Sequence, residues 1–222
     1  MGPRVFAAID LGASSGRVVA GVLERDRIGL RVVERFAHGP IEQDGHLRWN
    51  LTKVYGQVSD GLRRIPDAES VGIDGWGVDY GILDRDGILL AEPVSYRDDR
   101  TAEVVTRVHE LIPPSELYAI TGIQILPFNT IYQIVAEQDG PLWRHVGHAV
   151  LIPDLVAYWL TRELRTEVTN ASTTGLLDAR TRSIEALDAL LWLARVDESL
   201  GDSDLTPQGA DASARLGLRR GA

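Results

Sequence analysis

Apolar residues at the start of the chain fall into three short runs that predict β-strands. Residues 5–9 (VFAAI) form a continuous apolar run, and residues 17–23 (RVVAGVL) form a second run rich in β-branched side chains. Only a Gly- and Ser-rich heptapeptide separates the two runs, so we expect an antiparallel hairpin. Residues 30–36 (LRVVERF) alternate apolar and polar side chains and predict a third antiparallel strand.

Helical periodicity first appears after Asn50, a residue type that is favoured at helix N-caps. Val54, Val58, Leu62 and Ile65 recur at helical spacing, and Pro66 follows them. We therefore expect a helix over this segment that ends before the proline.

The rest of the chain alternates strand-like and helix-like segments. Expected strands cover 70–73, 80–83 and 149–152, and expected helices cover 100–112, a shorter stretch after Asn129, and 154–160. A turn is expected at 84–87, and Pro113-Pro114 should end the helix over 100–112. Three antiparallel strands followed by alternating helices and strands indicate an α/β fold.

Composition and charge narrow the range of functions. The chain has 222 residues, of which 44% are hydrophobic and 25% charged, as in an ordinary globular protein. The net charge of −9 argues against a nucleic-acid partner, and the absence of cysteine excludes disulfides, thiolate metal sites and a cysteine nucleophile. No apolar run has membrane-spanning length and the N-terminus lacks a secretory pattern, so we expect a cytoplasmic location and no membrane partner.

The first chemical motif is the hairpin segment from Asp10 to Arg17 (DLGASSGR). Gly12 and Gly16 permit close backbone approach, so a tight hairpin here can aim several N–H groups at one phosphate. Asp10, at the end of a buried strand, could hold Mg²⁺ through water. The motif is neither GxxxxGK[ST] nor GxGxxG, and an ordinary hairpin turn accounts for the local pattern equally well.

Three further segments carry polar and aromatic groups suited to a polyol. Residues 72–80 (GIDGWGVDY) join two expected strands through a Gly-rich turn with Trp76 at its tip. Residues 95–100 (SYRDDR) precede a helix, and residues 121–133 (TGIQILPFNTIYQ) form a long loop that ends in a helix N-cap. Taken singly, the turn is better interpreted as a structural one with its tryptophan packed inward, and the alternative interpretation of SYRDDR is a solvated capping segment.

Together these segments resemble one family. DLGASSGR, GIDGWGVDY, SYRDDR, TGIQILPFNTIYQ, residues 151–154 (LIPD) and residues 169–174 (TNASTT) occur in the order found in the rhamnulokinase branch of the FGGY carbohydrate kinases. The resemblance covers residues 5–181 and implies the amino-terminal lobe of that family. The lobe is ribonuclease-H-like, as in the actin/Hsp70/sugar-kinase superfamily, with a mixed sheet that opens with an antiparallel hairpin.

The resemblance also implies an activity and a set of site residues. ATP with Mg²⁺ would phosphorylate a ketose, in this branch L-rhamnulose to L-rhamnulose 1-phosphate. The implied ATP contacts are Ala13, Ser14, Ser15, Gly16 and Arg17, with Asp10 beside the metal and phosphates. Gly77 would lie against the sugar, with Trp76, Asp79 and Tyr96 as candidates for the wall of its pocket. Gln124 and Asn129 are hypotheses only, and Asp154 and Asn170 could equally be structural.

The sequence departs from the family pattern at its carboxyl-terminal end. The family's catalytic base is an aspartate in a His-Asp-Thr motif of a second lobe, which also holds the adenine pocket, and this sequence contains no His-Asp pair. We expect the family domain over residues 1–182, a helical continuation over 183–200, and a disordered tail over 201–222 that has few large apolar residues. A truncated kinase with negligible turnover is therefore expected.

Three alternatives remain at this point. The chain could be a non-catalytic sugar- or phosphate-binding module, or a kinase fragment whose sugar is another ketose such as xylulose or fuculose. It could also be an inactive fragment that associates with itself through an uncovered inter-lobe face.

Overall fold

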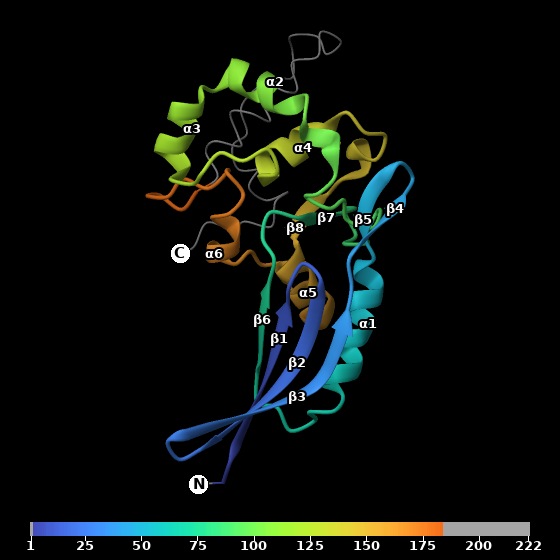
Figure 1. Ribbon diagram of the computed structural model, residues 1–222, viewed down its shortest axis with the longest axis vertical. Helices are drawn as coiled ribbons and strands as arrows, with labels where there is room; N and C mark the ends of the chain where they lie inside the picture. The colour runs from blue at the N-terminus through green and yellow to red at the C-terminus, as the bar shows by residue number, and fades with distance from the viewer. Residues whose placement is uncertain (1, 184–222) are drawn as a thin grey trace.

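The computed structural model describes residues 2–183 and is organised around a four-stranded mixed sheet (Figure 1). Its strands are β1 (Arg4–Leu11), β2 (Ser15–Glu24), β3 (Arg27–Ala37) and β6 (Val71–Gly75), in the order β3-β2-β1-β6. β1, β2 and β3 are antiparallel neighbours, whereas β6 runs parallel to β1. The predicted hairpin and third antiparallel strand are confirmed.

Two helices, α1 (Leu51–Leu62) and α5 (Ile152–Thr161), pack against this sheet. The first core joins strand residues such as Ile9 and Val18 to helix residues such as Val54, Val58 and Leu155, all of them buried. Asn50 caps α1 as predicted, because its side-chain oxygen accepts a hydrogen bond from the N–H of Lys53. The helix ends at Leu62, three residues earlier than the periodicity suggests, although Ile65 still packs into the core.

A second core lies above the sheet in the view of Figure 1. Strands β7 (Tyr80–Leu83) and β8 (His148–Leu151) pair antiparallel, and helices α2 (Val104–Leu111), α3 (Pro114–Thr121) and α4 (Thr130–Gln138) contribute to this core. The predicted strands of residues 70–83 therefore belong to two different sheets. The turn between them carries the chain from the first core to the second.

Several elements differ from expectation. The expected helix over 100–112 starts as the short 3₁₀ segment η1 (Asp99–Thr101) and continues as α2. Pro113-Pro114 does not merely end a helix, because α3 begins at Pro114, where the missing N–H has no cost. The hairpin of β4 (Pro40–Gln43) and β5 (His46–Trp49) was not predicted. Two short segments complete the fold, η2 (Trp143–His145) and α6 (Val168–Ala171).

Two sequence-based expectations concern residues outside the described part of the chain. The helical continuation over 183–200, apart from Ser183, and the tail over 201–222 lie there. Within residues 2–183, no helix combines the length and apolar character needed to cross a membrane.

Candidate functional site

The predicted phosphate hairpin and the predicted sugar turn meet at one edge of the sheet. β1 and β6 are parallel, with Leu11 beside Gly75 at their carboxyl-terminal ends. The N–H of Trp76 donates to the carbonyl of Leu11 at 3.0 Å, which ties the two segments together. Segments about 60 residues apart in sequence therefore begin from adjacent strand ends.

The hairpin after β1 is closed by backbone hydrogen bonds. The N–H of Gly12 donates to the carbonyl of Ser15 at 3.0 Å, and the N–H of His38 donates to the carbonyl of Ser14 at 3.1 Å. Ser14 and Ser15 are exposed and Ala13 is partly exposed at the tip. Gly16 is buried, and a Cβ there would lie 2.4 Å from the ring of Phe36. Packing therefore requires glycine at this position.

Asp10 and Arg17 face each other at the base of the hairpin. They are register partners, and Oδ2 of Asp10 lies 2.6 Å from Nε and 2.5 Å from Nη2 of Arg17. Both side chains are partly exposed, and the exposed Asp74 is the register partner of Asp10 on the other side. The two charges predicted to meet phosphate and metal thus lie in direct contact.

His38 links the hairpin to the turn. Its ring centroid lies 5.3 Å from that of Trp76 and 5.8 Å from that of Trp49. Burial lowers the pKa of His38, and the backbone carbonyls of Gly12 and Ser15 oppose this only in part. Burial therefore favours the uncharged form of this ring. Sequence reasoning did not single out this residue.

The turn from Trp76 to Asp79 has an unusual backbone. The N–H of Asp79 donates to the carbonyl of Gly77 at 2.9 Å, and Val78 between them has a φ of 66°. This is the γ-turn with positive φ, which is rare and strained, especially for a β-branched residue. Backbone strain of this kind persists only where the surrounding structure enforces it, and it is concentrated at functional sites.

Side chains from distant elements enforce this turn. Oγ1 of Thr173 accepts from the N–H of Val78 at 3.2 Å, and Oγ1 of Thr130 donates to the Val78 carbonyl at 2.7 Å. Gly77 is packed so closely that a Cβ would lie 2.8 Å from Oγ1 of Thr173. Thr173 belongs to the TNASTT segment, which explains why that segment accompanies the turn.

Asp79 is completely buried and lies within a ring of donors. Its Oδ2 accepts from the indole N–H of Trp49 at 2.6 Å and from that of Trp76 at 3.1 Å. Its Oδ1 accepts from Nε2 of Gln133 at 3.1 Å. Burial raises the pKa of Asp79, and these donors, together with the backbone N–H of Tyr96, oppose that rise. Because Asp79 is 0% exposed, its carboxylate does not face solvent. It instead accepts hydrogen bonds from the two tryptophan indoles.

Four aromatic side chains gather around this turn, and we call them the aromatic cluster: Trp49, Trp76, Tyr96 and Phe128. Ring centroids lie 4.6 Å apart for Trp49 and Trp76, 6.4 Å for Trp49 and Tyr96, and 5.7 Å for Tyr96 and Phe128. Trp49 is fully buried, whereas the other three are partly exposed. The predicted wall residues Trp76 and Tyr96 therefore come together, on a base formed by Trp49.

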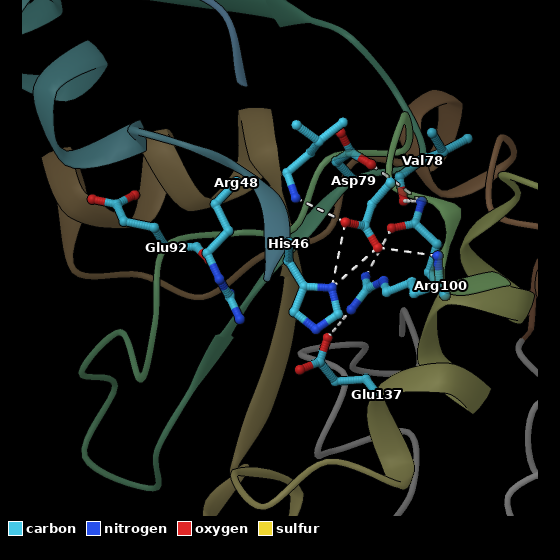
Figure 2. Close-up of polar contacts among 10 residues, drawn as sticks. His46, Arg48, Val78, Asp79, Glu92, Arg100 and Glu137 are labelled. Carbon is cyan, nitrogen blue, oxygen red and sulfur yellow. Dashed lines mark hydrogen bonds and ion pairs between the residues drawn. The ribbon is translucent and has the colours of Figure 1, made fainter. Parts of the chain in front are cut away.

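The SYRDDR segment caps η1 as one of its interpretations suggests, but its capping residue, Asp98, is buried and not solvated. Asp98 is buried and accepts from the backbone N–H groups of Leu47 at 2.8 Å and Arg100 at 3.1 Å. Nδ1 of His46 lies 3.2 Å from Oδ1 of Asp98. Figure 2 shows Arg100 close to His46 and to Glu137. The segment therefore anchors η1 to β5, the strand that ends at Trp49 of the aromatic cluster.

The remaining candidates lie at different places. Gln124 is exposed, whereas Asn129 is buried and its Oδ1 accepts from the N–H of Leu126 at 2.7 Å, closing the loop before α4. Asp154 is buried in the first turn of α5, and its Oδ1 accepts from the N–H of Glu167 at 3.2 Å. Burial raises the pKa of Asp154 to about 6, and the Glu167 charge adds to this. Asn170, on α6, lies beside Asp154.

Metal binding by protein groups alone is not favoured. Within residues 2–183, no three histidine or carboxylate side chains are close enough to enclose a metal ion. A Mg²⁺ ion suits such a surface only when water and substrate phosphates complete its octahedron. Asp10 is the residue at the hairpin that fits this role.

The comparison with protein families supports the sequence resemblance. A sequence profile described as "FGGY family of carbohydrate kinases, N-terminal domain" matches residues 5–191. A rhamnulokinase of Bacillus subtilis (strain 168) is 39% identical over 185 residues, covering 82% of this chain and 38% of the relative. A rhamnulokinase of Enterobacter sp. (strain 638) is 42% identical over 183 residues, covering 79% and 37%.

Solved structures share the fold. A gluconate kinase from Lactobacillus acidophilus superposes with a TM-score of 0.75 at 16% identity, covering 89% of this chain and 41% of the other. A Plasmodium falciparum glycerol kinase with ADP gives a TM-score of 0.65 at 21% identity, covering 82% and 39%. This chain spans about two fifths of the length of the proteins it matches. The matched profile, which extends over most of the chain, shows that this protein belongs to the FGGY family of carbohydrate kinases.

Proposed function

We propose that this chain supplies the phosphate-binding surface and part of the sugar-binding surface of an ATP-dependent kinase for L-rhamnulose. One observation carries this proposal: β1 pairs with both β2 and β6, so the Gly12–Arg17 hairpin and the Trp76–Asp79 turn share one sheet edge. Phosphoryl transfer requires phosphate and acceptor side by side. Identities of 39% and 42% to rhamnulokinases favour L-rhamnulose over xylulose or fuculose as the acceptor.

The hairpin would bind the ATP phosphates. Ala13, Ser14, Ser15 and Gly16 offer backbone N–H groups and hydroxyls at its tip, and Arg17 offers a guanidinium at its base. Backbone N–H groups converging in a tight turn favour an anion, and a guanidinium forms strong charge-assisted hydrogen bonds to phosphate.

Asp10 would hold Mg²⁺ through one carboxylate. Its Oδ2 is shared with Arg17 at 2.5 Å, so Oδ1 would be the oxygen available to a cation unless Arg17 turned away toward the phosphates. A bound Mg²⁺ would offset negative charge on the phosphates during transfer. This chain's own contribution is to hold the Asp10 carboxylate at the strand end nearest the hairpin. There it lies opposite Arg17, which follows it by 7 residues in the sequence.

The turn and the aromatic cluster would bind the sugar. Gly77 presents backbone without a side chain, and the partly exposed rings of Trp76 and Tyr96 would form the wall beside it. Apolar ring faces with a few fixed polar groups are typical of small-molecule sites. Asp79, although proposed from sequence as part of this wall, would act by orienting the two indoles.

In the proposed reaction a sugar hydroxyl oxygen forms a bond to the γ-phosphorus of ATP. The bond between that phosphorus and the bridging oxygen breaks, ADP leaves, and the hydroxyl proton passes to a base. The family resemblance places this aspartate base and the adenine pocket in a second lobe. The residues of this chain would bind and orient, and we expect negligible turnover from the chain by itself, since orientation without a base and a closed site supports little transfer.

Binding and turnover measured on one preparation of the 222-residue chain test this proposal. Calorimetric titration should give tighter binding of L-rhamnulose than of L-fuculose or D-xylulose, with ADP formation near background in the presence of MgATP. Gly77→Ala should weaken sugar binding, because its Cβ would lie 2.8 Å from Oγ1 of Thr173. Gly72→Ala is the matched control, because its Cβ meets nothing within 4 Å.

Two results would contradict the proposal. Equal or absent binding of all three ketoses would remove the basis for the substrate. Sugar-dependent ADP release at the rate of a complete kinase would show that the base lies within this chain.

A further inference from the structure

A buried ion pair lies on the side of Gln133 away from the aromatic cluster. Nη1 of Arg100, at η1, pairs with Oε2 of Glu137, on α4, and the two side chains are only 10% and 14% exposed (Figure 2). A buried ion pair is weak as a source of stability, because desolvation of both charges offsets their attraction. Its presence between two short elements therefore calls for another explanation.

Arg100 also fixes the orientation of a buried amide. Its Nη2 donates to Oε1 of Gln133 at 3.1 Å, and Gln133 is 1% exposed. With its oxygen held by the guanidinium, the amide must direct Nε2 to the opposite side. A flipped amide would place its NH₂ against the guanidinium and its oxygen against a carboxylate, and both contacts are repulsive.

The fixed amide in turn holds the turn at the proposed sugar site. Nε2 of Gln133 lies 3.1 Å from Oδ1 of Asp79, 2.9 Å from the carbonyl of Phe128 and 3.3 Å from that of Val78. Asp79 then accepts both indole N–H groups at Oδ2. Four side chains, Glu137, Arg100, Gln133 and Asp79, thus lead in sequence to the indoles of Trp49 and Trp76.

We propose that Arg100 and Glu137 are positioning residues for the sugar-facing tryptophan, acting through Gln133 and Asp79. This rests on the proposed function, because it assigns the purpose of the pair to the orientation of Trp76 beside the ketose. Without Arg100, the Gln133 amide can rotate, Asp79 loses the donor to Oδ1, and the carboxylate no longer holds a single orientation. Both indoles then lose their fixed acceptor.

A double variant separates positioning from stability. Arg100→Met leaves Glu137 buried without its partner and should lower stability. Arg100→Met/Glu137→Met replaces the pair by apolar side chains of similar size, which in other proteins is often neutral for stability. The double variant should therefore regain stability to urea while Gln133 stays unanchored.

The indole N–H groups provide the readout in the full 222-residue chain. In ¹H–¹⁵N spectra, the Trp49 and Trp76 indole signals are assigned with Trp49→Phe and Trp76→Phe. We expect both signals to move upfield in Arg100→Met/Glu137→Met, because their hydrogen bonds lengthen. The dissociation constant for L-rhamnulose should rise about fivefold, the equivalent of one ordinary hydrogen bond.

Two controls make the result specific. Arg107→Met removes another cation that spans α2 and the end of α4, paired with Asp139 at 3.0 Å but with no contact to Gln133 among the described hydrogen bonds. It should leave the indole signals and the sugar affinity unchanged. Glu137→Gln keeps an acceptor for the guanidinium, so this variant should retain most of the wild-type indole shifts and sugar affinity.

The proposal is overturned if the double variant keeps both indole signals in place and binds L-rhamnulose within about twofold of wild type. It is also overturned if Arg107→Met produces the same shifts. A wild-type chain that binds none of the ketoses contradicts the proposed function instead, and the indole signals still decide whether Arg100 and Glu137 position the tryptophans.

Discussion

Single residues decide how closely the hairpin and the turn approach their neighbours. Gly16 and Gly77 each lie where a Cβ would be closer than 3 Å to another side chain, Phe36 in one case and Thr173 in the other. Their φ values are not unusual, so these glycines serve close packing and not a left-handed backbone. The backbone at the proposed site can therefore lie directly against a neighbour or a ligand.

Gly16→Ala should lower the free energy of unfolding by about 1–3 kcal/mol through overpacking. The new Cβ would lie 2.4 Å from Cε2 and Cζ of Phe36, a buried ring in the first core. Gly21→Ala, on the same strand, is the control, because its nearest neighbour is Cδ2 of Leu30 at 3.7 Å. Urea denaturation of both variants gives the comparison, and equal stabilities would contradict the packing.

The raised pKa of Asp154 predicts that the stability of the fold falls as the pH rises toward neutrality. Its pKa is raised from 3.8 to about 6 by burial and by the Glu167 charge, so the folded protein binds this proton more tightly than the unfolded chain. The stability contributed by the protonated form is fully present below about pH 4 and is lost as the pH rises through about 6. The loss amounts to about 3 kcal/mol at 1.36 kcal/mol per unit of pKa.

The free energy of unfolding of wild type minus that of Asp154→Asn isolates this effect. We expect the difference to fall as the pH rises from about 4 to 7, because the variant carries no ionisable group at the site. Urea denaturation at several pH values measures it. A difference that is constant or that rises with pH would show that Asp154 does not carry a raised pKa.

Residue-level chemistry was only partly predictable. Asp10, Arg17, Trp76 and Tyr96 could be selected because each lies within a short motif. The distant partners of Asp79 could not, since Trp49 precedes it by 30 residues and Gln133 follows it by 54. No local pattern records which distant donors reach a buried carboxylate.

Among the elements, the start of α1 is held by two capping side chains. Asn50 accepts from the N–H of Lys53, while the Glu92 carboxylate accepts from the N–H groups of Leu51 at 2.7 Å and Thr52 at 3.2 Å. A carboxylate at a helix N-terminus satisfies free N–H groups and interacts favourably with the helix dipole. Glu92 thus ties the segment before the SYRDDR motif to the helix that covers the sheet.

Glu92→Ala should therefore lower the free energy of unfolding by about 1–2 kcal/mol. Glu42→Ala, an exposed glutamate on β4, is the control and should change stability little. Urea denaturation again provides the measurement. If both variants lose the same amount, the cap contributes nothing specific.

Element prediction succeeded where hydrophobic period and length were clear. The alternation in β3 and the spacing of Val54 and Val58 in α1 indicated their elements directly. The hairpin of β4 and β5 was missed although Asp44-Gly45, with φ of 53° and 78°, is a favoured two-residue turn. Its strands have four residues each, too few for a periodic signal.

At the scale of the whole molecule, two cores meet at the proposed site. β1, β6 and α5 belong to the first core, whereas β7, α2 and α4 belong to the second. The Trp76–Asp79 turn crosses between them, and the N–H of Ile152 donates to the Asp79 carbonyl at 3.1 Å. The family membership predicted from six motifs is confirmed, while the site roles stay predictions because they depend on ligands.

Mapping ligand contacts by amide chemical shifts in the ¹⁵N-labelled chain tests the central claim most directly. Titration with MgATP should shift the signals of residues 12–17, and titration with L-rhamnulose should shift those of residues 76–79 and the Trp76 indole. Adjacent but distinct sets of shifted signals would support a phosphate surface and a sugar surface at one sheet edge. Shifts confined to other parts of the chain, or none with either ligand at millimolar concentration, would contradict it.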